Sequence, residues 1–323
     1  MRPPPVAEPP FEAEVDSGNT VRCSEWCRRH GLDPVGTAGS YAGYLLVEWP
    51  LPWPRDVSEL DVMEGARDAL GDRGIRVQLL VPPEGPDRSS LRIALYLRPP
   101  GLFTRYVGKE TSVPFRARDS EERDALGRSI RTATEELLAG GGSSIPQPDV
   151  LVCTHGRRDR CCGSFGTELW RGAESRGDIE GRLARTSHTG GHRFAPTGIV
   201  LPDGTLWAYL DPDLLAGAVS HRGPLAQLLR RYRGCSGLST PSVQAVERAI
   251  FARMGWRLLS LPREGQAEPG GRVTFRIGPP EPSVWTASVR PGRSIPIPPC
   301  GGPLTPGAKT ETEHRVIGLS RTG

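Results

Sequence analysis

Cysteine and histidine residues gather in one stretch, residues 152–201, and this clustering constrains the fold more than any other feature of the chain. The stretch holds three of the seven cysteines and three of the six histidines. The cysteines are Cys153, Cys161 and Cys162, and two of the histidines, His188 and His192, form a second group further along. Thiols and imidazoles are the side chains that bind soft transition metals. The fold is therefore expected to bring the two groups together.

Composition limits the classes of protein to which the chain can belong. Its 323 residues suffice for two domains with appendages, and its 33 prolines and 40 glycines lie largely at the ends and in connectors. No apolar run reaches the roughly 18 residues that span a bilayer, and residues 1–15 lack the apolar core of a signal peptide. We therefore expect a cytoplasmic protein without membrane association. Seven cysteines, an odd number, in such a chain favour metal binding or catalysis over a disulfide framework.

The formal net charge of +4 is modest, and no basic stripe with interleaved aromatic residues is visible. We therefore expect no nucleic-acid partner. Near the N-terminus, Cys23 and Cys27 have the i,i+4 spacing of one helix face. No second pair of ligands lies nearby in the sequence, so ordinary packing is favoured over a metal site for these two thiols.

Composition shifts divide the chain into five segments. These are a disordered N-terminal tail (1–18), a first half (19–139), a Gly/Ser/Pro linker (140–148), a second half (149–260) and a Pro/Gly-rich C-terminal appendage (261–323). Apolar periodicity predicts strands at 43–49, 75–81, 91–97, 104–107, 149–153, 183–187, 197–201 and 205–210. Helices are predicted at 57–73, 121–138, 165–176, 211–221, 225–232 and 243–254. Short strands are predicted in the appendage at 273–277, 284–289 and 314–319.

Both halves thus share a β-α-β-β-α succession. This succession is thioredoxin-like, and we interpret the α/β protein as a degenerate duplication of two thioredoxin-like halves with a small β-rich C-terminal appendage. In the first half, the positions that would carry chemistry are apolar or proline. That half is therefore interpreted as structural.

The ligand spacing in the central stretch is compatible with two kinds of metal centre. Two adjacent glycines between His188 and His192 disfavour a helix and favour a loop that wraps around a ligand. Two thiolates with two imidazoles suit either a tetrahedral zinc ion or a [2Fe–2S] cluster with cysteines on one iron and histidines on the other. Structural zinc sites usually present a shorter C-x(2–4)-C knuckle than the loop between Cys153 and Cys162. The wide loop, with its three arginines, favours the larger anionic cluster, and zinc stays open as the alternative.

The motif CTHGRRDRCCGSFG, followed by SHTGGHRFAPTGIVLPDGTLWAYLD, resembles the sucrase/ferredoxin-like family. The resemblance runs from about Cys23 to Trp256 and includes DPVGTAGSYAGYLLVEWPLPW and YRGCSGLSTPSVQAVERAI. It implies a thioredoxin-like ferredoxin fold and a [2Fe–2S] cluster held by a C-x8-C loop and an H-x3-H motif outside the Rieske fold. In this chain the implied ligands to iron are Cys153, Cys162, His188 and His192.

Five neighbouring residues are candidates for supporting the cluster without binding it. Because Cys161 adjoins Cys162, either could be the second thiolate; spacing favours Cys162. His155, just after a strand end, is assigned to stabilising the loop. Ser187 and Thr189 either tune the site by hydrogen bonding or shape the loop. Arg193 either guides an acidic redox partner or is a solvated loop residue.

We therefore expect electron transfer or redox sensing, by an electron carrier rather than an enzyme, with an unidentified redox partner that delivers or accepts electrons. Histidine ligands raise the reduction potential and retain a ring nitrogen that can gain or lose a proton. Reduction is hypothesised to be coupled to protonation, and a midpoint potential that stays flat from about pH 6 to about pH 10 would contradict this. The alternatives are a structural Cys2His2 zinc module and a thioredoxin-like thiol oxidoreductase. The latter would need C-x-x-C where the chain has vicinal cysteines.

Overall fold

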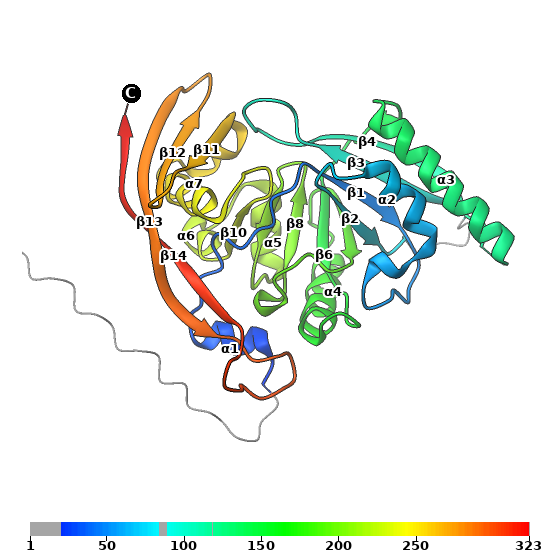
Figure 1. Ribbon diagram of the computed structural model, residues 1–323, viewed down its shortest axis with the longest axis horizontal. Helices are drawn as coiled ribbons and strands as arrows, with labels where there is room; N and C mark the ends of the chain where they lie inside the picture. The colour runs from blue at the N-terminus through cyan, green and yellow to red at the C-terminus, as the bar shows by residue number, and fades with distance from the viewer. Residues whose placement is uncertain (1–20, 84–88, 118, 323) are drawn as a thin grey trace, which may run out of the picture.

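The chain builds one large mixed β-sheet and a separate, smaller antiparallel sheet. A computed structural model describes residues 21–83, 89–117 and 119–322 (Figure 1). The predicted disordered tail, residues 1–18, lies outside these ranges. The large sheet has ten strands in the order β10-β9-β8-β6-β7-β2-β1-β3-β4-β5, and the small sheet has the order β11-β12-β13-β14. The expectation of an α/β protein with a β-rich C-terminal part is confirmed.

The same pairing pattern occurs twice in the large sheet. In the first half, β1 is parallel to β2 and antiparallel to β3, which pairs with β4. In the second half, β6 is parallel to β7 and antiparallel to β8, which pairs with β9. The halves meet where β2 and β7 pair antiparallel through Leu80 and Thr186. The strand bounds are β1 (Gly43–Glu48), β2 (Ile75–Leu80), β3 (Ser90–Leu97), β4 (Val107–Pro114), β6 (Asp149–Cys153), β7 (Arg182–Thr186), β8 (Gly198–Leu201) and β9 (Thr205–Trp207).

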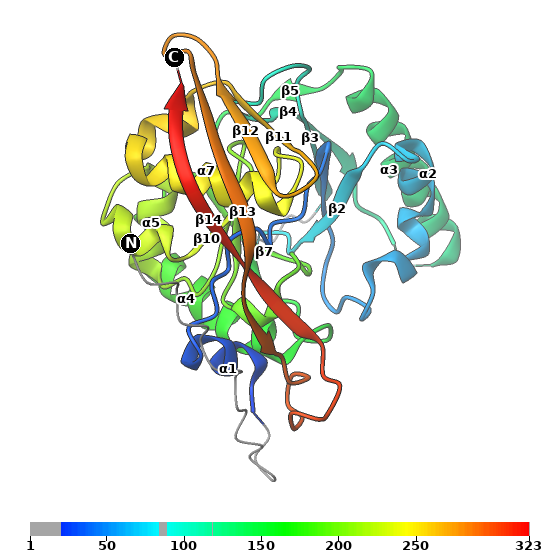
Figure 2. The ribbon, with the colours of Figure 1, turned by 60° about the vertical axis from the view of Figure 1, so that its left-hand side comes forward.

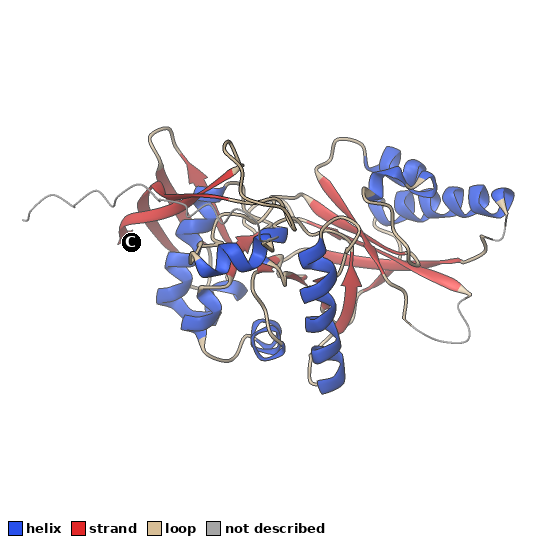
Figure 3. Cartoon of the chain, turned by 90° about the horizontal axis from the view of Figure 1, so that it is seen from below, coloured by secondary structure: helices blue, strands red, loops and turns tan. Residues whose placement is uncertain are grey.

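Two short strands extend the sheet at its edges. β5 (Ser143–Ser144), within the predicted linker, pairs with β4, and β10 (Tyr232–Cys235) pairs with β9. Helices lie on both sides of the strands (Figure 3). They are α1 (Cys23–Arg29), α2 (Glu64–Leu70), α3 (Ser120–Leu138), α4 (Thr167–Arg176), α5 (Pro212–Ser220), α6 (Leu225–Leu229) and α7 (Pro241–Met254).

Alternating residues of β1 supply two hydrophobic cores, as the pleat of a strand requires. Leu45 and Val47 pack with residues of α2 and α3, whereas Tyr44 and Leu46 belong to the larger core that includes α4, α5 and α7. The strand is buried along its whole length, which accounts for its continuous apolar sequence.

Some element boundaries differ from the predicted ones. The strand predicted at 104–107 is observed instead as β4, which begins at Val107. Its sequence is largely polar and its residues are half-exposed, so a search for apolar runs does not find it. The helix predicted over 57–73 is interrupted, because Leu60 is extended between two 3-10 turns, η1 (Val57–Glu59) and η2 (Asp61–Met63). The predicted helix cap at Asp211 is confirmed: its side chain accepts the Leu214 N–H, with Pro212 at the first helical position.

The C-terminal sheet packs against the main body. It comprises β11 (Arg263–Ala267), β12 (Arg272–Ile277), β13 (Ser283–Pro296) and β14 (Thr310–Thr322). The buried Arg263 donates to Glu247 of α7 at 2.9 Å. The long β13–β14 ribbon reaches α1, where Trp26 Nε1 donates to the Pro296 carbonyl at 2.9 Å (Figure 2). The loop between β13 and β14 therefore lies beside the N-terminal helix.

Over the residues described, no helix is both long enough and apolar enough to cross a lipid bilayer.

Candidate metal centre

Strand β6 delivers the first candidate ligand, Cys153, at its buried C-terminal end. The second, Cys162, begins a π-helical turn, Cys162–Gly166, that leads into α4. This turn approaches the strand end so closely that a Cβ at Gly166 would overlap the Cys153 carbonyl. A glycine at 166 therefore lets the start of the helix lie against the strand, which places the two thiols side by side.

The two histidines lie on the loop that follows β7. Gly190 and Gly191 have φ values of +78° and +72°, a left-handed conformation that favours glycine. The His188 carbonyl accepts hydrogen bonds from Arg76 Nη2 at 2.5 Å and Gln78 Nε2 at 3.2 Å. Both donors belong to β2, so the first half of the chain anchors the histidine loop of the second half.

A buried arginine holds the same loop from its other side. Arg233 of β10 donates from Nη1 to the Gly190 carbonyl at 3.0 Å and from Nη2 to the Thr37 carbonyl at 2.6 Å. Its guanidinium packs against Gly191 so closely that a Cβ there would overlap it. Strands from both halves thus fix the backbone that carries the histidines.

Three of the four predicted ligands converge. The ligand atoms of Cys153, Cys162 and His188 all lie within 4.8 Å of one another, and both cysteines are buried while the histidine is half-buried. The Nδ1 atom of His188 is buried and has no hydrogen-bond partner among the described residues. A hydrogen bond from the Cys162 thiol holds the pKa of Cys153 well below its usual range, and the same bond raises the pKa of Cys162. The site therefore stabilises a thiolate, the form that binds metals.

The fourth predicted ligand, His192, lies next to this group but turns one nitrogen away from it. Its ring centroid is 6.1 Å from that of His188. Its Nδ1 atom is 2.7 Å from Asp159 Oδ2 and 3.2 Å from Cys23 Sγ. Because Asp159 occupies Nδ1, Nε2 is the nitrogen of the His192 ring that could bind a metal.

The side chains of His155 and Cys161 have their hydrogen-bond partners outside the converging group. His155 donates from Nε2 to the Pro54 carbonyl at 2.9 Å, and its ring lies edge-on to Trp53. Its contacts thus hold the loop to the first half. Cys161 faces Cys23, with 3.6 Å between the sulfur atoms.

The three polar candidates all have protein partners. Ser187 Oγ accepts the Leu79 N–H at 3.0 Å, and Thr189 shares a hydrogen bond of 3.0 Å with Thr197. Arg193 pairs with Glu311 of β14 at 2.7 Å and is largely buried. Its charge is therefore directed at the C-terminal sheet.

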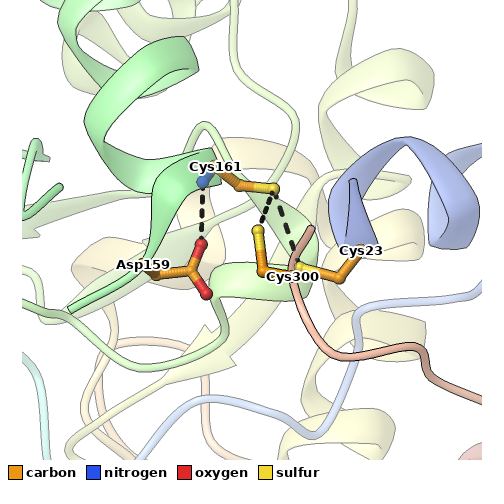
Figure 4. A group of neighbouring side chains, drawn as sticks. All are labelled: Cys23, Asp159, Cys161 and Cys300. Carbon is orange, nitrogen blue, oxygen red and sulfur yellow. Dashed lines mark hydrogen bonds between the residues drawn. The ribbon is translucent and has the colours of Figure 1, made fainter. Parts of the chain in front are cut away.

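A second group of possible ligands was missed by the sequence reasoning. Cys23, Asp159, Cys161 and Cys300 also bring their ligand atoms within 4.8 Å of one another (Figure 4). No short spacing links these residues, since 138 residues separate Cys23 from Cys161 and 139 separate Cys161 from Cys300. The one available signal is that Cys23 and Cys300 lie outside the C-x8-C loop, and that Cys161 within this loop is not one of its two predicted ligands.

Comparison with known proteins identifies the family. Residues 34–234, more than half of the chain, match the family described as Sucrase/ferredoxin-like. No curated protein and no solved structure matches the chain. The matched range spans both halves of the large sheet and includes all four predicted ligands, and it confirms the predicted resemblance. The chain belongs to the sucrase/ferredoxin-like family.

Proposed function

We propose that the chain binds a [2Fe–2S] cluster through Cys153, Cys162, His188 and His192 and works in electron transfer or redox sensing. The observation that carries this proposal is the convergence of two thiols and one imidazole at the end of β6, with the second imidazole beside them. The unpartnered Nδ1 atom of His188 supports it, because a buried polar atom without a partner is costly unless a ligand satisfies it.

The donor set fits such a cluster chemically. When bound by two thiolates and two neutral imidazoles, a [2Fe–2S] cluster exchanges an electron at a higher potential than one bound by four thiolates. The cysteines are buried whereas both histidines are half-buried. The histidine side is therefore the side from which a redox partner would approach, and we propose that the partner is another protein that delivers or accepts electrons.

The residues around His192 prepare it for this role. His192 Nδ1 contacts Asp159 Oδ2 at 2.7 Å. This contact orients the imidazole ring and leaves Nε2 free. A carboxylate behind a ligating histidine fixes the tautomer in this way in many metal sites. The proposal includes coupling between reduction and the proton held at this nitrogen, and the measurement of midpoint potential against pH tests it.

We also propose that the two halves are thioredoxin-like units related by a degenerate duplication. The support is that both halves have the same strand order and the same strand directions. At the end of β1, the strand equivalent to β6, the chain continues as Trp49 and Pro50 where the second half has its ligand loop. Only the second half would then carry the cluster.

A structural zinc site is the second candidate, and one observation favours it. Ligand atoms that lie within 4.8 Å of one another are compatible with a single ion as well as with a cluster. Zinc lacks redox chemistry and gives a colourless protein, so the two candidates differ in optical and magnetic properties.

The test is electron paramagnetic resonance of the full-length protein after reduction with dithionite, with iron and sulfide analysis. The cluster should give a reddish-brown protein with about two irons per chain and a signal from the reduced state. His188→Cys and His192→Cys should each lower the midpoint potential, because an anionic thiolate replaces a neutral imidazole. Cys235→Ala, a buried cysteine of β10 outside both ligand groups, is the matched control. A colourless protein whose zinc depends on Cys153 would contradict the proposal.

A further inference from the structure

Three cysteines from distant parts of the chain meet beside the candidate cluster site. Cys23 is the first residue of α1, Cys161 immediately precedes the π-helical turn, and Cys300 lies in the loop between β13 and β14. The Cys161 sulfur is 3.6 Å from that of Cys23 and 3.1 Å from that of Cys300. A carboxylate oxygen of Asp159 completes the group within 4.8 Å (Figure 4).

These spacings suit ligands of one metal ion. Zinc–sulfur bonds of about 2.3 Å in a tetrahedron place two sulfur atoms about 3.8 Å apart. The observed separations of 3.1 and 3.6 Å approach that value. They are well above the roughly 2.05 Å of a disulfide bond, and all three thiols are free.

The chemistry of the neighbouring groups distinguishes these thiols from ordinary packed cysteines. Asp159 brings a carboxylate to the group, with Oδ1 accepting the Cys161 N–H at 2.8 Å. Cys27, one turn further along α1, provides the contrast, because it is buried outside the group. Three thiols and a carboxylate at a largely buried position form a donor set that suits a borderline-soft cation.

We propose that Cys23, Cys161, Cys300 and Asp159 form a second metal site, distinct from the cluster site, that binds one zinc ion. Thiolates select soft or borderline metals, and carboxylate oxygen is an accepted fourth ligand of zinc. Binding releases one proton from each thiol that is still protonated, and these protons pass to solvent. Cys300 is only half-buried, which gives the ion a path of entry.

The site would fasten three segments to one another. It links α1, the loop before α4 and the β13–β14 loop, which together lie next to the histidine face of the cluster site. Through Asp159 it also reaches His192. The expected role is therefore structural: the ion holds the N-terminal helix and the C-terminal ribbon against the cluster-bearing half.

Metal analysis of the full-length protein, purified from zinc-supplemented medium, tests the site. We expect about one zinc per chain in addition to iron, and Cys300→Ser should weaken zinc binding by about tenfold or more while leaving iron and visible absorbance unchanged. Cys23→Ser should weaken zinc binding to the same extent. Cys27→Ala, the matched control on the same helix, should retain both metals. Because zinc and iron are counted separately, failure of this site is distinguishable from failure of the cluster proposal.

X-ray absorption at the zinc edge tests the proposal on the wild-type protein, because it reports which atoms bind the zinc and at what distances. The expected coordination is three sulfur atoms at about 2.3 Å and one oxygen atom at about 2.0 Å. The proposal would be overturned if the zinc had two sulfur and two nitrogen ligands, or if the wild-type protein held no zinc. It would also be overturned if zinc were lost in Cys153→Ala but retained in Cys300→Ser, or if mass spectrometry found a Cys161–Cys300 disulfide.

Discussion

Asp149 begins β6, at the opposite end of that strand from Cys153, and its side chain is fully buried. Its two oxygens accept hydrogen bonds from Arg92 Nη1 at 3.1 Å and Nη2 at 2.7 Å, and Tyr96 Oη donates to Oδ2 at 2.6 Å. Arg92 and Tyr96 belong to β3 of the first half. This ion pair therefore joins the two halves of the sheet by polar contacts.

The cost of breaking the pair follows from these contacts. Asp149→Ala removes three hydrogen bonds to a charged group, each worth about 1.5–3 kcal/mol. Breaking a buried ion pair costs about 3–5 kcal/mol when the remaining charge is left alone. Here Arg92 keeps a second anion, because its Nε atom is 2.5 Å from Glu110 Oε2. We therefore expect a loss at the low end of that range, about 3 kcal/mol in the free energy of unfolding.

Urea unfolding followed by circular dichroism measures this loss, and visible absorbance reports whether the proposed cluster is intact. The matched control is Glu135→Ala, which breaks the exposed pair with Arg131 on α3 and should cost less than about 1 kcal/mol. Replacing the buried pair together, as Arg92→Met with Asp149→Leu, should recover part of the stability, because no unpaired arginine remains. Tyr96 Oη and Glu110 each lose one partner in this variant, so the recovery is incomplete. The reasoning is refuted if Asp149→Ala costs no more than the control.

Three further changes test the site and the core. Gly166→Ala should reduce iron content and thermal stability, because a Cβ there overlaps the carbonyl at the end of β6. Gly127→Ala on α3 should not, because a Cβ there makes only ordinary van der Waals contacts with Val62. Arg76→Met removes the shortest hydrogen bond to the His188 carbonyl and should speed iron release to a chelator by about tenfold. Burial raises the pKa of Cys235 to about 12. The stabilisation from the buried neutral thiol is therefore full below about pH 9, and it is lost as the pH rises toward 12 because the unfolded chain ionises this thiol first. Urea unfolding from pH 8 to 11 should show a flatter decline for Cys235→Ala than for the wild type.

The local parts of the architecture could be predicted because each depends on a short-range pattern. β6 is a continuous apolar run that ends at Cys153, and the diglycine before His192 marks a left-handed turn. Strand β4, whose outer side pairs only with the short edge strand β5, could not be found in this way because the residues in its middle, 109–112, are polar. The repeated strand order was suggested by the succession of elements, but the joining of the two halves into one sheet depends on the β2–β7 contact, for which no local pattern exists.

The site was predictable to the same extent. Spacing favours Cys162 over its neighbour Cys161 as the partner of Cys153, and the family resemblance implies the same pair. Cys300 belongs to a different sheet, and its approach to Cys161 depends on the path of a ribbon whose strands, Ser283–Pro296 and Thr310–Thr322, extend well beyond the predicted 284–289 and 314–319. Contacts between residues so far apart in sequence are set by tertiary packing, which periodicity does not encode.

The vicinal cysteines show how the two groups of ligands are related. Cys161 has helical backbone angles, φ −65° and ψ −43°, and Cys162 begins the helical turn that follows it. Consecutive residues on a helix project about 100° apart, so the two side chains cannot reach the same centre easily. The structure accordingly turns Cys162 toward Cys153 and His188, and Cys161 toward Cys23 and Cys300. The two vicinal cysteines therefore supply one thiol to each of two adjacent groups of candidate ligands. Neither cysteine is redundant, although the pair is unsuited to dithiol chemistry.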